Sequence, residues 1–341
     1  MSKNGNLRAA KAPRNKTIDF TVDENDPGRK YLSEALKIHS PATEQDVHNR
    51  IILGDLFQSA PLLPAESVDL LIADPPYNLT KDFGNMKFTK TSPSAYVEFT
   101  RRWIESIYPL LKKNASIYVC CDWESSSAIG SVLGEFFNIQ NRITWQREKG
   151  RGALRNWKNG MEDIWFATKS KDYVFNVEDV KIRRKVIAPY RVNGKPKDWK
   201  ETSEGNFRDT FPSNFWDDIS IPYWSMPENT AHPTQKSEKL MAKLILASSN
   251  PGDMVFDPFM GSGSTAVTAK KLGRNFFGVE ANEQYCAWAY KRIEMAESDP
   301  SIQGYADGVF WERNTSAEQK SAKREKNFHQ QALLPIEKDR L

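Results

Sequence analysis

From about residue 46 to about residue 300, short apolar runs alternate with stretches in which apolar residues recur every three or four positions. A short apolar run is typical of a buried strand, and the wider spacing is typical of a helix packed on a sheet. This alternation predicts an α/β fold with a mostly parallel sheet. The predicted strands cover residues 68–73, 115–120, 139–145, 163–167, 254–256 and 276–279, and the predicted helices cover residues 93–110, 125–137, 240–245 and 264–272.

The strand at 68–73 is followed directly by Asp74-Pro75-Pro76-Tyr77. Two successive prolines cannot continue a central strand, so the chain must turn out of the sheet at this point. From average composition, this tetrapeptide should occur by chance in about one chain in a thousand of this length. The alternative without a function is a surface turn that is made rigid by its prolines.

These four residues suit methyl transfer to an aromatic amine. Because positive charge develops on the amine nitrogen, the site needs acceptors aimed at both of its N–H bonds. The carboxylate of Asp74 and the carbonyl of Pro75 can supply them, and the two prolines hold both in place. Tyr77 can stack on a base, which must be flipped out of a duplex to reach such a site.

A second strand ends at Asp257-Pro258-Phe259 and leads through Gly261-x-Gly263 into a helix. Glycines at such a turn let the backbone approach a ligand, and Glu280, at the end of the next strand, can accept the hydroxyls of a ribose. The loop alone also fits a dinucleotide oxidoreductase or a tight turn without a ligand. A complete α/β half precedes the loop and only residues 281–341 follow Glu280, which disfavours the oxidoreductase.

Charge and cysteine content narrow the remaining choices. The chain carries 48 basic and 44 acidic residues, so its net charge of +4 is weak evidence for nucleic acid. The three cysteines, Cys120, Cys121 and Cys286, form neither a disulfide framework nor a zinc spacing, which indicates reduced thiols in the cytoplasm. We see no metal-ligand cluster, membrane span or secretory signal.

The chain divides into five segments by composition. We expect residues 1–45 to form a flexible basic arm, residues 46–175 and 231–312 to form the catalytic domain, and residues 313–341 to form a polar tail. Residues 176–230, rich in Trp, Pro, Asn and charge, read as an insert that recognises the target sequence. A basic, glycine-containing loop offers phosphate contacts through Arg147, Lys149, Arg151, Arg155 and Lys158.

The two strand-end motifs together resemble those of the amino-methyltransferase family of DNA-modifying enzymes, which act on adenine N6 or cytosine N4. The catalytic motif precedes the cofactor motif, which resembles the circularly permuted beta group of that family. His232-Pro233-Thr234-Gln235-Lys236 is also similar to that group. Two departures stand out: Ser237 replaces a proline common in relatives, and Met161-Glu162 replaces a His-Glu pair.

The resemblance implies a Rossmann-like fold that binds S-adenosyl-L-methionine, with a mixed, mostly parallel sheet flanked by helices and a target-recognition insert. It implies that Asp74, Pro75, Pro76 and Tyr77 are catalytic. It assigns cofactor contacts to Asp55, Asp257, Phe259, Gly261, Gly263, Ser264, Glu280, His232, Thr234 and Lys236. Permutation is physically reasonable because strands need neighbours in the sheet more than order along the chain. If the strands before Asp74 and Asp257 are neighbours, both loops face one crevice.

The function expected from this sequence is transfer of a methyl group from S-adenosylmethionine to N6 of a flipped-out adenine in duplex DNA. The alternatives are a cytosine-N4 methyltransferase and a catalytically silent subunit that binds nucleic acid; RNA as substrate ranks lower. Asp74 favours adenine, because relatives that act on cytosine more often carry serine there. The expected partners are duplex DNA, a cognate restriction endonuclease and a second copy of the chain, and no membrane is expected.

Overall fold

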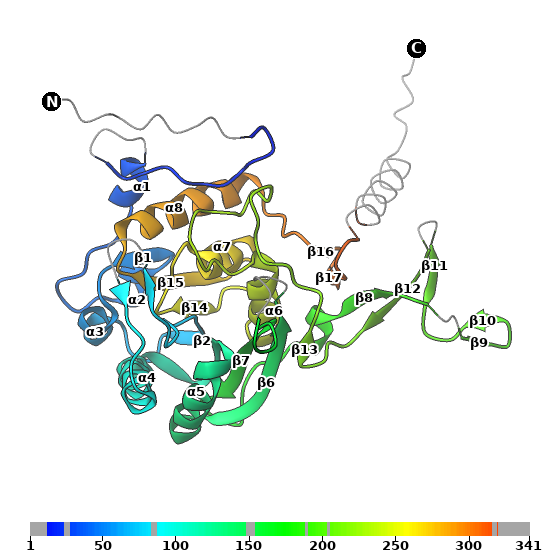
Figure 1. Cartoon of the computed structure of the whole chain (residues 1–341), viewed down its shortest axis with the longest axis horizontal. Coiled ribbons are helices and arrows are strands. Elements are labelled where there is room, and N and C mark those ends of the chain that lie inside the picture. Colours follow the sequence, from blue (N-terminus) through cyan, green and yellow to red (C-terminus); the bar gives the residue numbers. More distant parts are fainter. Residues whose placement is uncertain are drawn as a thin grey trace, which may run out of the picture.

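A computed structural model describes residues 12–23, 28–82, 87–147, 154–187, 190–202, 205–315 and 319. Its centre is an eight-stranded sheet with the order β1-β15-β14-β2-β5-β7-β6-β13 (Figure 1). Its strands are β1 (Arg50–Leu53), β2 (Val68–Ala73), β5 (Leu111–Cys121), β6 (Asn138–Gln146), β7 (Met161–Thr168), β13 (Phe215–Trp216), β14 (Met254–Asp257) and β15 (Asn275–Glu280). All neighbours pair in parallel except β5 with β7 and β7 with β6. The predicted mixed, mostly parallel sheet is therefore confirmed.

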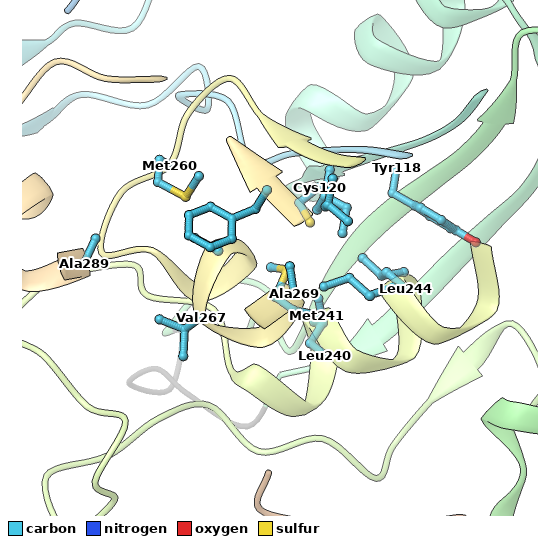
Figure 2. Close-up of a cluster of buried hydrophobic side chains, with 14 of the residues drawn as sticks. Tyr118, Cys120, Leu240, Met241, Leu244, Met260, Val267, Ala269 and Ala289 are labelled. Carbon is cyan, nitrogen blue, oxygen red and sulfur yellow. The ribbon is translucent and has the colours of Figure 1, made fainter. Parts of the chain in front are cut away.

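Helices cover both faces of this sheet. Apolar residues of α6 (Glu238–Ser248), α7 (Ser264–Lys271) and α8 (Glu283–Ser298) pack on one face. The other face is covered by α2 (Glu44–Val47), α3 (Leu56–Ser59), α4 (Pro93–Ile107) and α5 (Trp123–Phe136). Figure 2 shows part of the first layer, in which Leu240, Met241 and Leu244 of α6 form one buried cluster with Val267 and Ala269 of α7. No helix in the described part of the chain is long and apolar enough to cross a membrane.

Local signals in the sequence explain where α4 begins and where α7 ends. Ser92 caps α4 by accepting a hydrogen bond from the backbone N–H of Ala95, and Pro93 takes the first helical position, as expected. Gly273, the predicted terminator of α7, has a φ of +71°, which only glycine adopts freely. The buried strand β2 has its predicted bounds and β14 ends one residue later than predicted, whereas β5 begins at Leu111, four residues before its predicted start.

The predicted segments 176–230 and 231–312 are not separate in the structure. The insert contains η3 (Val177–Val180), β8 (Ile182–Lys185), β9 (Arg191–Val192), β10 (Lys195–Pro196), β11 (Lys200–Thr202) and β12 (Gly205–Thr210). Its sheet has the order β11-β12-β8-β17-β16, so β16 (Tyr305–Ala306) and β17 (Val309–Trp311), assigned above to the catalytic domain, complete it. β13, at the end of the insert, instead extends the central sheet beside β6.

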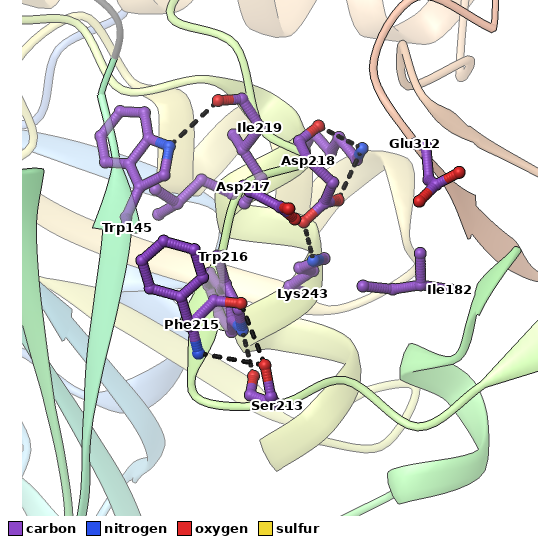
Figure 3. Close-up of polar contacts among 12 residues, drawn as sticks. Trp145, Ile182, Ser213, Phe215, Trp216, Asp217, Asp218, Ile219, Lys243 and Glu312 are labelled. Carbon is purple, nitrogen blue, oxygen red and sulfur yellow. Dashed lines mark hydrogen bonds and ion pairs between the residues drawn. The ribbon is translucent and has the colours of Figure 1, made fainter. Parts of the chain in front are cut away.

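Buried charge joins the insert to α6. Asp218 forms ion pairs with Lys239 at 2.7 Å and with Lys243 at 2.6 Å. Lys239 also donates a hydrogen bond to the backbone carbonyl of Asp218, and the indole N–H of Trp145 in β6 donates to the carbonyl of Ile219 at 3.0 Å (Figure 3). Each of these buried polar groups has its partner across the boundary, so the insert is held at a fixed place beside the central sheet.

The prediction of a flexible arm over residues 1–45 is wrong for much of its length. Ile18 pairs with Thr230 as an isolated bridge, and the carbonyl of Phe20 accepts hydrogen bonds from two side chains of α8. The helix α1 (Arg29–Ser33) buries Tyr31, whose hydroxyl donates to Glu294 at 2.8 Å. Isolated apolar residues hold this segment against the rest of the protein, but the charged residues between them obscure their pattern in the sequence. Residues 1–11 lie outside the described part of the chain.

Two short strands, β3 (Lys81–Asp82) and β4 (Lys87–Phe88), pair with each other in antiparallel fashion, and residues 83–86 between them lie outside the described part of the chain.

Candidate active site

Four parallel strands, β1, β15, β14 and β2, are adjacent in the sheet, so their carboxyl ends lie along one edge. The loops that follow these strands line a single cleft together with the segment 232–236. The strands before Asp74 and Asp257 pair directly, with Leu70 opposite Val255 and Leu71 opposite Phe256. The expected convergence of the two remote motifs on one crevice is therefore confirmed.

The structure brings nearly all of the predicted catalytic and cofactor-binding residues to this cleft. Its lining contains Asp55, Asp74, Pro75, Pro76, Tyr77, His232, Thr234, Lys236, Asp257, Phe259, Gly261, Ser264 and Glu280. Gly263 is the exception: it caps α7 with a φ of +80°, and a side chain there would contact Ala289 of α8. Its role is close helix packing, and it does not line the cleft.

Asp74 lies at the centre of a network of hydrogen bonds and ion pairs. The hydroxyl of Tyr77 donates to its Oδ1 at 2.8 Å, and the ammonium of Lys236 lies 2.6 Å from its Oδ2. Glu162 of β7 lies behind these residues, with its Oε2 at 3.4 Å from the Tyr77 hydroxyl and 3.5 Å from the Lys236 ammonium. Arg147 forms an ion pair with the other oxygen of Glu162.

The protonation states in this network follow from burial and charge. Burial, and then the carboxylates of Asp74 and Glu162, raise the pKa of Tyr77 well above its ordinary value, so the phenol is a neutral donor. Burial acts against the charge on Lys236, but the same two carboxylates outweigh it and raise the pKa of that ammonium. Lys236 is therefore a fixed cation beside the catalytic motif.

The backbone of the catalytic motif is held by α4. The hydroxyl of Tyr96 donates to the carbonyl of Pro76 at 3.2 Å. None of the described residues donates to the carbonyl of Pro75. The carbonyl of Pro75 therefore keeps its accepting capacity in the cleft that it lines together with Asp74.

The loop after β14 is fixed by the end of β15. Glu280 accepts hydrogen bonds at 2.7 Å from the backbone N–H groups of Gly261 and Asn282, one on each carboxylate oxygen. Asp257 accepts one from the N–H of Phe259 at 2.9 Å and one from the hydroxyl of Thr265 at 2.6 Å. Burial raises the pKa of Asp257 and of Glu280 to about 7. Each carboxylate keeps lone pairs that can accept from a ligand.

The remaining predicted positions have local roles as well. Asp55 caps α3 through its Oδ1, which accepts from the N–H groups of Phe57 and Gln58. The ring of His232 packs edge-on against Tyr285, and its Nε2 would be 3.3 Å from a side chain at Gly261. Asp55 thus both caps a helix and lines the cleft.

The predicted basic loop is only partly described. Arg155 and Lys158 are exposed beside Trp157, which is 96% exposed, whereas Lys149 and Arg151 lie outside the described residues. Arg147 points inward to Glu162, as noted above. The sequence analysis did not predict that Glu162 lies in the site and pairs with Arg147 and Lys236. Two adjacent acids, Glu162 and Asp163, inside an otherwise apolar strand were the available signal.

Comparisons with known proteins agree with this geometry. Residues 68–291 match the model of the N6_N4_Mtase family, described as DNA methylase. The chain belongs to this DNA methylase family. It is 35% identical to the type II methyltransferase M.HpaI of Haemophilus parainfluenzae, over 72% of this chain and 74% of that protein. It is 34% identical to the DNA adenine methyltransferase YhdJ of Escherichia coli K12, over 72% and 83%.

Solved structures support the fold of this DNA methylase family member. The crystal structure of an M1.HpyAVI–SAM complex aligns with a TM-score of 0.50 at 28% identity, over 71% of this chain and 98% of that one. The cytosine-N4-specific PvuII DNA methyltransferase aligns with a TM-score of 0.52 at 16% identity, over 71% and 85%. The second likeness concerns the fold alone.

Proposed function

We propose that this DNA methylase transfers a methyl group from S-adenosylmethionine to N6 of an adenine that is flipped out of duplex DNA. The observation that carries the proposal is the juxtaposition of Asp74, the Pro75 carbonyl and the glycine loop in one cleft. The names of two relatives support it: YhdJ is called an adenine methyltransferase, and the M1.HpyAVI structure contains SAM.

The residues of the cleft fit that cofactor. Glu280 is suited to the ribose hydroxyls, because each of its oxygens has one backbone donor and keeps accepting capacity. Gly261, with a φ of +54°, lets the backbone come close to a ligand, and Asp55 and Phe259 line the same cleft. When bound, the cofactor supplies a methyl group on a positively charged sulfur.

The chain's own residues would prepare the amine. Asp74 and the carbonyl of Pro75 accept its two N–H bonds, which draws the nitrogen lone pair out of conjugation with the ring and stabilises the positive charge that develops. Tyr77 holds the carboxylate of Asp74 in position, and Tyr96 holds the motif's backbone through the carbonyl of Pro76. Most of the rate gain would come from this fixed alignment and from proximity.

Tritiated-methyl incorporation into defined unmethylated duplexes, followed by nucleoside analysis, tests this function. We expect N6-methyladenine; recovery of N4-methylcytosine alone would instead establish the cytosine alternative. Asp74→Ala should abolish methylation while cofactor binding, measured by titration, stays close to that of the native chain. Asp253→Ala, at the opposite end of β14 from the cleft, is the matched control and should keep its turnover. A native chain that binds no cofactor would favour the silent subunit.

We also propose that the insert contacts the duplex. Within residues 181–200 there are eight basic residues and one acid, Asp198, a local charge of 8 − 1 = +7 against +4 for the whole chain. The basic residues are Lys181, Arg183, Arg184, Lys185, Arg191, Lys195, Lys197 and Lys200. Replacing exposed Lys195 and Lys197 by glutamine should reduce the slope of log affinity against log salt by about 1.8, that is, about 0.9 per phosphate contact. An unchanged slope would remove these two residues from the DNA interface.

The other expected partners belong to the same proposal. A cognate restriction endonuclease is supported by the type II names of M.HpaI and of M1.MboII from Moraxella bovis, which is 33% identical over 70% of this chain. A cytoplasmic location, where duplex DNA is accessible, follows from the same function. The homodimer implied by the family resemblance can be tested by analytical ultracentrifugation.

A further inference from the structure

One lysine in the active site faces two carboxylates. The ammonium of Lys236 lies 2.6 Å from Oδ2 of Asp74 and 3.5 Å from Oε2 of Glu162, and the Lys236 side chain is 6% exposed. The hydroxyl of Tyr77 shows the same asymmetry, at 2.8 Å from Asp74 and 3.4 Å from Glu162. Both shared donors therefore favour Asp74 in this structure.

This arrangement opposes the proposed chemistry. Both oxygens of Asp74 already accept, one from Tyr77 and the other from Lys236. A substrate amine must share the carboxylate with a permanently charged ammonium, and that ammonium repels the positive charge that methylation builds on the amine. The site would be better suited to the transition state if Lys236 lay closer to Glu162.

Arg147 explains why Lys236 does not lie there. Arg147 forms an ion pair with Oε1 of Glu162, and its backbone N–H donates to the carbonyl of Gly160 at 2.7 Å, beside the paired ends of β6 and β7. The guanidinium of Arg147 compensates the negative charge of Glu162, so Glu162 attracts Lys236 only weakly. Asp74 has no arginine among its described ion-pair partners.

Arg147 is also the member of this cluster that a DNA phosphate could reach. Its side chain is 30% exposed, whereas those of Glu162 and Lys236 are 4% and 6% exposed. Its Nε is buried and has no hydrogen-bond partner among the described residues. An arginine that is partly exposed and incompletely bonded is suited to exchange its carboxylate for a phosphate.

We propose that Glu162 is a positioning residue that draws Lys236 away from Asp74 once a DNA phosphate binds Arg147. A buried carboxylate that loses its cation must find another, and Lys236 is the nearest one. When the ammonium of Lys236 moves from Asp74 to Glu162, Oδ2 of Asp74 becomes free for the substrate amine. Binding of the duplex would thus activate the acceptor. This inference rests on the proposed function.

Glu162→Gln is the direct test, because it keeps the shape of the side chain but leaves Lys236 on Asp74. We expect kcat to fall by at least about tenfold, while KM for DNA and the cofactor dissociation constant change by less than about twofold. Asp163→Asn, the next residue of β7, is the matched control. Asp163 accepts from Ser126 and Thr144, away from Lys236, so its kcat should stay within about twofold.

A second substitution separates positioning from a merely structural role. In the Glu162→Gln background, Lys236→Met removes the ammonium that blocks Asp74, so the double variant should turn over faster than the single variant at saturating cofactor. A double variant slower than Glu162→Gln, or a Glu162→Gln protein with native kcat, would overturn the inference. If the native chain methylates no adenine, the proposed function itself fails; if it does, these outcomes concern Glu162 alone.

Discussion

Gly263, at the start of α7, offers a prediction whose size can be worked from the structure. Its φ is +80°, and an added Cβ would lie 2.6 Å from Cβ and 3.0 Å from Cα of Ala289 in α8. Gly273, at the other end of α7, has a similar φ of +71° but nothing within 4 Å of the corresponding position. The two glycines therefore share the backbone cost of a side chain, and only Gly263 adds a collision.

The expected losses of stability differ accordingly. A left-handed conformation costs a non-glycine residue about 1–2 kcal/mol, which is the whole effect expected for Gly273→Ala. Overpacking against a neighbouring helix adds about 1–3 kcal/mol, so Gly263→Ala should lose about 2–5 kcal/mol. The collision involves backbone and a short side chain, so no flexible atoms can move aside to relieve it.

Urea unfolding of the native chain and both variants measures these differences. Equal slopes against urea are required for the comparison, since a changed slope would indicate a changed unfolded state. Because the loop before Gly263 lines the cleft, Gly263→Ala should also weaken cofactor binding, whereas Gly273→Ala should not. Equal losses of stability in the two variants would refute the packing role assigned to Gly263.

Two further predictions concern buried charge. The folded-state pKa values of Asp257 and Glu280, about 7, lie above the ordinary values of 3.8 and 4.5, so their contribution to stability is complete below pH 4 and is lost as the pH rises through 7. The melting temperature of the cofactor-free protein should therefore fall between pH 5 and pH 8, and Asp257→Asn should flatten that dependence; a flat profile in the native chain would contradict the assignment. Asp218→Asn leaves Lys239 and Lys243 without their buried counter-charge. The free energy of unfolding, measured in urea, should therefore fall by about 3–5 kcal/mol. A fall below about 1 kcal/mol would show that the cluster does not hold the insert.

The sequence was sufficient for the central sheet and for most of the cleft. Buried parallel strands have continuous apolar runs, and the residues after them collect at one sheet edge wherever the strands stand in the chain. Asp74 and Asp257 could therefore be placed together before the structure was known, although 183 positions separate them. The packing role of Gly263 could not be foreseen, because a glycine needed for helix packing and one needed for ligand approach look identical in a sequence.

Other features were beyond the reach of local patterns. The position of Lys236 between Asp74 and Glu162 depends on three segments far apart in the chain, and each of these residues is ordinary in its own context. The packing of Tyr31 and its neighbours on α8 likewise depends on partners more than 250 positions away. Such contacts leave no periodic signal, because periodicity reports only the face that a residue occupies.

Completion of the insert sheet by β16 and β17 has a consequence for engineering. The fragment 176–230 moved alone into a related enzyme would arrive without β17, which pairs with β8, and without β16, which pairs with β17. A chimaera intended to exchange DNA specificity would have to carry residues 305–311 from the same donor. A target-recognition role of the insert, as proposed, would therefore require exchange of two separate stretches of the chain together.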